Sequence, residues 1–364
     1  FRPKKIMKKI FLVLLFTIFS FNLAQAISLS DALSEAYKNN PELNAERESL
    51  NVSEEDFNIS KSEFLPSLTI SGSKSSEDTS KNTDRSGANS AVTDVNSKTQ
   101  SVLIEQKLFQ GFAGVAGYEK NKIGLSLAQA KYLKKEQDIL FKAIEAYTGL
   151  ALAKEKLEIN LSNVNLSERQ VETDQSRLER GEITLADVAQ SESSLAESQA
   201  KLIESQNKVL TSRLEYEKVV GPLESIDNFN NNYEIALKVP SSLNQAIKIS
   251  KNNNPDLVIA KLEYEQSEKD VTIAKSEFSP SATLSLESSK TDDLSATVDE
   301  RDKETVKATI SWPIFNGGKN FAELNRSKSL KNRKKLLFNY AHKSNETSVA
   351  SAWANLQSTE SLLN

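Results

Sequence analysis

Few side chains in this sequence are suited to catalysis or to metal binding. Among its 364 residues there is no cysteine and a single histidine, His342. His342 lies in the segment FNYAHKSNE, where we expect a solvated helix position in preference to a ligand or a general base. Neighbouring carboxylates such as Glu54 and Glu55 are expected on a solvated helix face. With no glycine-rich phosphate loop and no nucleophile beside a base, the sequence predicts no enzyme and no catalytic, cofactor-binding or metal site.

The composition points to extended polar helices as the elements that carry the function. Hydrophobic residues make up 38% of the chain and charged residues 26%, with 11 Gly and 8 Pro, a balance that favours long helices over a large compact core. The 46 basic and 50 acidic residues nearly cancel, so nucleic acid is not an expected partner.

The N-terminal segment has the pattern of an export signal. From Met7 it reads MKKIFLVLLFTIFSFNLAQA, with two lysines, an apolar run and a small-x-small cleavage site. The apolar run is shorter than the ~20 residues that a membrane-spanning helix needs. Residues 1–26 are therefore interpreted as upstream sequence (1–6) followed by a signal peptide, and the mature chain is expected to begin at Ile27, outside the inner membrane.

A long internal duplication organises the rest of the chain. Without gaps, residues 39–71 match residues 253–285 at 16 of 33 positions, and NNPEL returns as NNPDL. Later segments, such as LFQGFAGVA from Leu108 and IFNGGKNFA from Ile314, match at an offset of 206 instead of 214. The lost residues fall in a Ser/Asn/Thr/Asp-rich stretch before Leu108, where a loop can change length. A unit of roughly 200 residues is thus present twice, too long for a solenoid repeat.

The predicted domains follow this duplication. In chain order they are a first structural repeat (27–222) with a β hairpin (about 66–109) and a long helical hairpin (about 118–220), a linker (223–238), and a second structural repeat (239–364) with a β hairpin (about 280–315). The second repeat is expected to be incomplete at its C-terminus, because the returning helix of the first has no counterpart. Ser30 is the predicted cap of the first short helix, and Pro41 suits the first turn of the next.

Alternating apolar and polar residues after Pro66 and Pro280 predict strands with one apolar face. The predicted lipid-facing set is Leu68, Ile70, Val102, Ile104, Leu284, Leu286, Val306, Ala308 and Ile310. Four such strands leave two open edges, and closure into a barrel is obligatory if the apolar face meets lipid. One chain has too few strands, so several chains would each contribute four; a soluble β sandwich is the alternative. Phe109, Trp312 and Phe315 at the strand ends could form an aromatic girdle.

Apolar residues at seven-residue spacing predict a helical hairpin with coiled-coil packing. The outgoing helix carries Leu150, Leu157, Val164, Val171 and Leu178, and the returning helix carries Val188, Leu195, Leu202, Val209 and Tyr216. An outgoing helix from about Tyr118 to Leu178 would be about 90 Å long, which excludes it from the core of a compact domain.

This order of elements resembles the outer-membrane efflux protein (TolC) family. The most specific part is RLERGEITLADVAQSESSLAESQAKLIESQNKVLTSRLEYEKVVG, residues 177–221, which is similar to the family's helix-turn-helix with its R-L-x-x-G, I-T-x-x-D-V and terminal Gly. The resemblance implies a mainly α fold with β hairpins, in which a trimer forms a long α-helical coiled-coil barrel and a transmembrane β-barrel with four strands per protomer. It also implies that the second of two internal repeats is truncated before the helical tip that carries the family's gate residues.

The function implied by the resemblance is a passive exit duct, the outer-membrane channel of a tripartite efflux pump or a type I secretion system. The implied partners are the other copies of a homotrimer, a periplasmic adaptor (membrane fusion) protein, an inner-membrane pump or ABC exporter, and outer-membrane lipid. The implied location is the outer membrane of a Gram-negative-type envelope, with a large periplasmic helical part. The family's adaptor-binding tip corresponds here to Arg177, Leu178, Gly181, Thr184, Asp187 and Val188.

Two alternatives belong to other classes, a periplasmic coiled-coil adaptor and a structural stalk protein. An adaptor typically has a single helical hairpin flanked by Gly-rich β domains, so the duplication argues against it. A stalk would explain the heptads, but it gives no reason for Pro66 and Pro280 to lead into alternating strands at equivalent places.

Overall fold

The computed structural model describes residues 27–83, 85–90, 93–223, 239–295 and 298–363. The expected signal peptide and all but Leu223 of the expected linker lie outside these residues. The chain divides into two compact units, one formed by residues 1–47 and 134–239, the other by residues 48–133 and 240–364. These units differ from the two sequence repeats, because helices α3 and α4 each run from one unit into the other.

The first unit is helical. It contains α2 (Leu29–Asn39), the start of α3 (Pro41–Ser62), most of α4 (Ala113–Glu179) and α5 (Leu185–Val219). The largest fully buried side chains of the described chain all lie in this unit: Leu43, Ile139, Tyr147, Leu150 and Leu223. The Tyr147 hydroxyl is satisfied within this core by donating to the Ile27 carbonyl oxygen at 3.1 Å.

Helix α2 begins two residues earlier than predicted. Its cap is Ser28, whose hydroxyl accepts from the Asp31 N–H at 3.2 Å while the Asp31 carboxylate accepts from the Ser28 N–H at 3.1 Å. The prediction of Ser30 as the cap is wrong, because an acidic residue three positions after Ser28 completes a capping box that Ser30 cannot form.

The repeated NNP motif caps a helix in both repeats. Asn40 accepts from the N–H groups of Glu42 and Leu43 at 2.9 and 3.1 Å, and its amide donates to the Val219 carbonyl at 2.8 Å. In the second unit Asn254 accepts from the Asp256 N–H at 2.8 Å. The asparagine side chain satisfies N–H groups that the start of a helix leaves unbonded, and the proline that follows has no N–H to satisfy.

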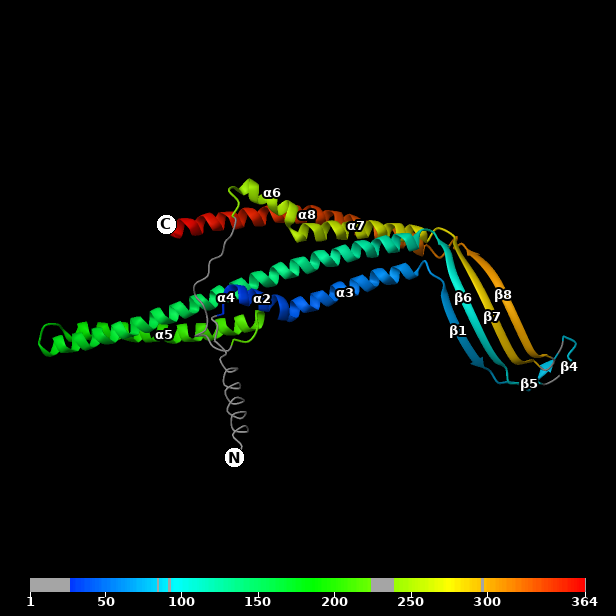
Figure 1. Ribbon diagram of the computed structural model, residues 1–364, viewed down its shortest axis with the longest axis horizontal. Helices are drawn as coiled ribbons and strands as arrows, with labels where there is room; N and C mark the ends of the chain where they lie inside the picture. The colour runs from blue at the N-terminus through cyan, green and yellow to red at the C-terminus, as the bar shows by residue number, and fades with distance from the viewer. Residues whose placement is uncertain (1–26, 84, 91–92, 224–238, 296–297, 364) are drawn as a thin grey trace, which may run out of the picture. The chain divides into compact units, whose positions relative to one another are not determined.

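The second unit contains a four-stranded antiparallel sheet in the order β1-β6-β7-β8 (Figure 1). These strands are β1 (Ser67–Lys74), β6 (Lys98–Gln110), β7 (Ser281–Ser295) and β8 (Val298–Ser311). Between β1 and β6 lie two short pairs, β2 (Glu77–Thr79) with β5 (Thr93–Val95) and β3 (Asn82–Thr83) with β4 (Asn89–Ser90). Pro66 and Pro280 immediately precede β1 and β7, as expected of residues that end a helix and permit an extended backbone.

Helices that precede and follow the strands complete the second unit. They are the end of α3, the start of α4, α6 (Leu243–Asn253), α7 (Pro255–Ser276) and α8 (Lys319–Leu363), with α7 packed along α8. Ion pairs join α4 to α7, Glu119 to Lys269 at 2.5 Å and Lys120 to Asp270 at 2.7 Å. Among the described helices, none is both long and apolar enough to cross a membrane.

The junction between β6 and α4 depends on Gly111. Gly111 and Phe112 both have left-handed backbones, with φ of 58° and 70°, and helix α4 starts directly after them at Ala113, earlier than the predicted Tyr118. A Cβ atom on Gly111 would lie 2.5 Å from the Ser279 Cβ and 2.7 Å from the Ser276 carbonyl oxygen. No side chain fits this position without displacing the end of α7 or the turn that follows it.

We expect Gly111→Ala to lower the free energy of unfolding by about 1 to 3 kcal/mol, because it combines a strained backbone with a steric clash. Gly117 is the matched control, since it lies inside α4 and a Cβ there meets nothing within 4 Å. Gly117→Ala should be neutral or stabilise by up to about 1 kcal/mol. Thermal unfolding of both variants in detergent measures the difference, and equal melting temperatures would contradict this account of the junction.

Candidate functional site

The sheet has one apolar face whose residues are aligned across all four strands. Leu68 pairs with Ile104, Ile104 with Leu286, and Leu286 with Val306. Directly opposed residues of antiparallel strands point to the same face, so these four side chains form one row. A second row runs from Ile70 through Val102 to Ser288 and Glu304, and Leu284 with Ala308 and Ala282 with Ile310 extend the face towards the helices.

All nine residues of the predicted lipid-facing set lie on this apolar face. They are Leu68, Ile70, Val102, Ile104, Leu284, Leu286, Val306, Ala308 and Ile310. Several are largely exposed, with Ile70 and Val306 at 75% and Ile310 at 77%. An apolar surface of this extent and continuity is unusual for a side of a protein that faces water.

Aromatic side chains border the apolar face where the strands meet the helices. Trp312 is 60% exposed and Phe315 80%, while Phe109 packs edge-on against Phe112 with ring centroids 5.5 Å apart. The Trp312 indole N–H donates to the Phe278 carbonyl oxygen at 3.0 Å. An anchored indole with an exposed ring suits the boundary between hydrocarbon and water.

The opposite face of the sheet is polar, and Leu103 is its exception. Leu103 lies between Thr69 and Glu287. Strands β1 and β8 lie at the two ends of the sheet order, so each pairs on one side within the described chain. Their free edges present unpaired N–H and C=O groups beside an exposed apolar face, a combination that promotes further strand pairing.

The turn of the helical hairpin, in the first unit, ends α4 with a Schellman motif. The Glu182 N–H donates to the Arg177 carbonyl at 2.9 Å and the Gly181 N–H donates to the Leu178 carbonyl at 2.8 Å. Gly181 has φ of 75°, which this motif requires at the position after the helix end. The glycine of the predicted tip set is therefore explained by backbone geometry.

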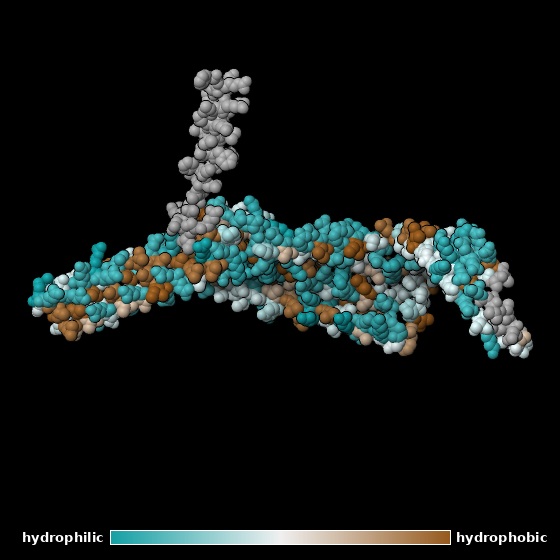
Figure 2. Space-filling view, turned by 90° about the horizontal axis from the view of Figure 1, so that it is seen from below, coloured by the Kyte–Doolittle hydropathy of each residue, from teal (hydrophilic) through white to brown (hydrophobic). Residues whose placement is uncertain are grey.

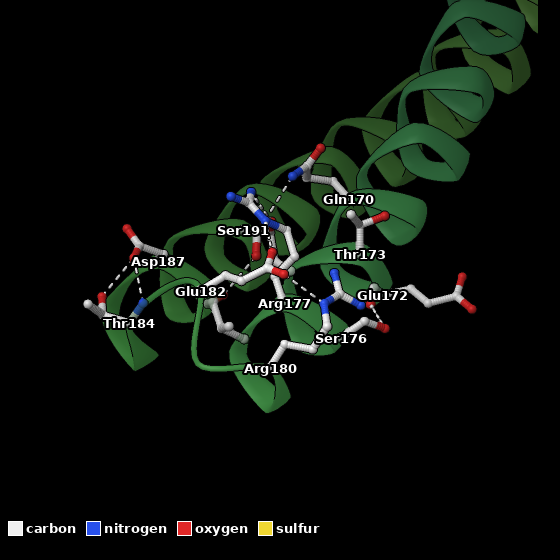
Figure 3. A network of polar contacts seen from close by, with 12 residues as sticks. Gln170, Glu172, Thr173, Ser176, Arg177, Arg180, Glu182, Thr184, Asp187 and Ser191 are labelled. Atoms are coloured by element: carbon white, nitrogen blue, oxygen red, sulfur yellow. Dashed lines mark hydrogen bonds and ion pairs between the residues drawn. The ribbon is translucent and has the colours of Figure 1, made fainter.

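Charged side chains fix both sides of the turn (Figure 3). Glu182 lies between Arg180 and Arg177, at 2.9 and 3.4 Å, and these guanidinium groups lower the pKa of its carboxyl group. Asp187 accepts from both the N–H and the hydroxyl of Thr184 at 2.8 Å, and these bonds lower the pKa of Asp187. Both carboxylates are therefore charged at neutral pH, and Asp187 completes the capping box at the start of helix α5, whose cap residue is Thr184.

The six predicted tip residues come together at this turn, but they are not equally exposed. Gly181, Thr184 and Asp187 are exposed, and Arg177 and Leu178 are half-buried. Val188, in contrast, is buried at 4% exposure, so its side chain is not part of the surface of the turn. Because Val188 belongs to the seven-residue apolar series of α5, its side chain points into the seam between α4 and α5. Leu185, outside the predicted set, is 72% exposed and is the large apolar side chain presented by the turn.

The helical seam also contains a polar layer that was not predicted from the sequence. Three residues after each of the first four members of the α5 series comes a serine: Ser191, Ser198, Ser205 and Ser212. The corresponding α4 positions are Ala153, Asn160, Ser167 and Asp174. The Ser167 and Ser198 hydroxyls lie 3.0 Å apart, and the Asn160 amide donates to the Lys201 carbonyl at 3.4 Å. The small serine and alanine side chains in this layer let the two helices approach closely. The layer could have been found in the sequence as a second seven-residue series, three residues after the apolar one.

The acidic residues of the described chain are scattered or paired with basic ones. In the part of the chain that the structure describes, no three His, Cys, Asp or Glu side chains are grouped as a metal site requires. A groove of about 440 Å³ in the first unit includes charged residues of both signs: Glu42, Glu145, Glu215, Lys142, Lys208 and Lys218. Glu42 is itself engaged by Lys135 at 2.6 Å, which lowers the pKa of Glu42 and raises that of Lys135.

The sequence profile of the outer membrane efflux protein family matches residues 32–221 and 246–364, which cover both repeats. The chain belongs to this family. The resemblance inferred from residues 177–221 and from the duplicated plan is confirmed.

Two relatives of known name align with most of the chain. Outer membrane efflux protein BepC of Brucella suis is 25% identical over 346 residues, which span 94% of this chain and 72% of BepC. Alkaline protease secretion protein AprF of Pseudomonas aeruginosa is 24% identical over 306 residues, which span 82% of this chain and 63% of AprF.

The fold also matches solved structures. The outer membrane protein VceC from Vibrio cholerae superposes with a TM-score of 0.74 at 18% identity, covering 90% of this chain and 79% of VceC. The predicted fold class, mainly helical with β hairpins as in TolC-like channels, is confirmed.

Proposed function

We propose that this chain is the outer-membrane channel of a tripartite efflux pump or a type I secretion system, a passive duct through which solutes or proteins leave the cell. The observation that carries the proposal is the four-stranded sheet with an aligned apolar face and two free edges. Family membership supports it, and the names of two relatives, an efflux protein and a protease secretion protein, fit the two kinds of assembly.

Closure of the sheet requires other copies of the chain. Because β1 and β8 are at opposite ends of the sheet, β8 of one copy can pair with β1 of the next, and such head-to-tail contacts close into a ring. A homotrimer with four strands per protomer would form a transmembrane β-barrel in the outer membrane, with the nine apolar residues towards lipid and the polar face towards a water-filled lumen.

The helices extend the duct into the periplasm. Two similar repeats in each of three protomers would line a coiled-coil barrel with pseudo-sixfold symmetry. The duct itself carries out no chemical step, so we propose that the chain is not an enzyme. Energy comes from an inner-membrane pump or ABC exporter, joined to the duct by a periplasmic adaptor protein that binds the tip of the α4–α5 hairpin.

The first test is the duct itself. The complete protein, purified in detergent, should run as a trimer that resists dissociation and should conduct ions after insertion into planar bilayers. A monomer that never conducts would contradict the proposal and favour the structural stalk.

The second test concerns the apolar face. Val306 lies in the central row of that face, so we expect Val306→Lys to weaken barrel insertion or stability by about 2 to 4 kcal/mol if this row lies near mid-membrane. Ile104→Lys in the same row should behave alike. The measurement is the fraction of heat- and detergent-resistant trimer in outer-membrane extracts.

The matched control for the apolar face is the neighbouring residue on the same strand. Thr305 points to the polar face, where it pairs with Glu287. Thr305→Lys adds the same charge beside a carboxylate and should be mild. Equal losses from Val306→Lys and Thr305→Lys would mean that the two faces have been assigned incorrectly.

The third test concerns the helical tip. Leu185 is exposed beside a turn whose charged residues already pair with one another, so it is the side chain best placed for an apolar contact with the adaptor. We expect Leu185→Ser to reduce adaptor crosslinking and export strongly while trimer assembly and conductance stay at parental levels. Leu185→Met keeps the apolar surface and should behave as the parent. Parental crosslinking and export in Leu185→Ser would show that the tip is merely a turn.

A further inference from the structure

Strand β8 separates most of its charges by sign. Glu300, Asp302 and Glu304 share a face with Val306, Ala308 and Ile310, whereas Arg301, Lys303 and Lys307 lie on the opposite, polar face. Asp299, near the start of the strand, is the one acidic residue of β8 on the polar face. Solubility alone would not require this separation, since mixed charges on either face serve that purpose. The polar face of the sheet therefore has a charge of its own that needs an explanation.

Two neighbouring rows of the polar face carry positive charge without negative charge. One row consists of Ser71, Ser101, Ser289 and Lys303, and the next of Ser73, Thr99, Thr291 and Arg301. The hydroxyls pair among themselves, Ser71 with Ser101 at 2.7 Å and Thr99 with Thr291 at 3.1 Å. Neither Arg301 nor Lys303 forms an ion pair with any residue that the structure describes. Both side chains are exposed and free to meet a solute.

The remaining charges of the polar face are closer to balance. Lys307 shares its row with Glu105, and Lys107 pairs with Glu63 at 2.8 Å. The row that lies between those of Lys307 and Lys303 contains one charged residue, Glu287. Asp299 lies two residues before Arg301 on β8, between the paired residues Val298 and Glu300. With two positive groups, Arg301 and Lys303, and one negative group, Asp299, the outer end of this face keeps a net positive charge.

We propose that the outer half of the lumen is selective for anions, because Arg301 and Lys303 form rings of positive charge in two neighbouring rows whose other side chains are uncharged hydroxyls. This inference rests on the proposed duct, in which the polar face lines the lumen. Rings of Arg and Lys side chains are the means by which pores favour anions and phosphate-bearing solutes. Arg301 can in addition hold a carboxylate or phosphate through two parallel hydrogen bonds.

The dimensions of the lumen make this charge effective. Four strands from each of three copies, spaced ~4.8 Å and tilted by about 40°, give a backbone radius of about 12 Å. The Debye length is about 8 to 10 Å at physiological salt. Since the side chains project inwards from the backbone, most of the lumen at these rows lies within one Debye length of a positive group. Selectivity should accordingly weaken as the salt concentration rises.

The test is the reversal potential of the complete protein in planar bilayers bathed in asymmetric potassium chloride. The parent should favour chloride, and Arg301→Gln with Lys303→Gln should lower the ratio of chloride to potassium permeability by about twofold or more. Asp302→Asn with Glu304→Gln is the matched control, because it neutralises two charges on the opposite face of the same strand. This control should leave the ratio at the parental value.

The outcomes separate this inference from the proposed function. A conducting parent that favours potassium, or a ratio unchanged by the Arg301 and Lys303 variants, would overturn anion selectivity while the duct stands. A larger change from the Asp302 and Glu304 control would overturn the assignment of the faces. Absence of conductance from the parent would overturn the duct, and the inference with it.

Discussion

The free edges of the sheet are the constraint on which the rest of the structure depends. Hydrogen-bonding groups on the outer sides of β1 and β8 need partners, and the apolar face beside them needs a non-aqueous surface. In water, the unpaired edges and the exposed apolar face both favour aggregation. In lipid, closure into a barrel pairs the edges and places the apolar face against hydrocarbon. The polar opposite face and the aromatic residues at the strand ends fit the proposed barrel, in which the sheet would separate lipid from water.

The two repeats share side-chain hydrogen bonds as well as the order of their elements. Asn40 and Asn254 accept from helix-start N–H groups in the same way, and the amide of each then ties its helix to another element, Asn40 to the Val219 carbonyl and Asn254 to the Asn345 side chain at 2.6 Å. Leu43 and Leu257, three residues later, are both buried. The conserved part of the repeat is therefore a helix cap with its anchor, whereas the strand tips are free to vary in length.

Much of the fold could be predicted because local periods determine it. The alternation around Leu68 and Ile70 and the seven-residue series through Val164 each define a face without knowledge of the partner. Other features depend on which residues of another helix or strand pack against a given side chain. Val188 belongs both to the tip motif and to the seam, and packing decides in favour of the seam. The hydroxyl environment of Arg301 and Lys303 follows from strand register, which no single segment of the sequence contains.

The helical hairpin, like the sheet, exposes apolar side chains that need a packing partner. Its seam uses one apolar series, yet a second stripe remains exposed: Leu152, Ile159 and Leu166 on α4 and Ile203 and Leu210 on α5, all at 56 to 69%. Figure 2 shows that apolar side chains reach the surface along the hairpin, at the left of the view. Burial of a leucine or isoleucine side chain contributes about 1.5 to 3 kcal/mol, so leaving five of them in water is costly. The sheet edges require hydrogen-bond partners and the helical stripe requires apolar ones. In the proposed trimer, copies of the chain arranged around one axis would supply both, whereas a stalk would leave the sheet edges without partners.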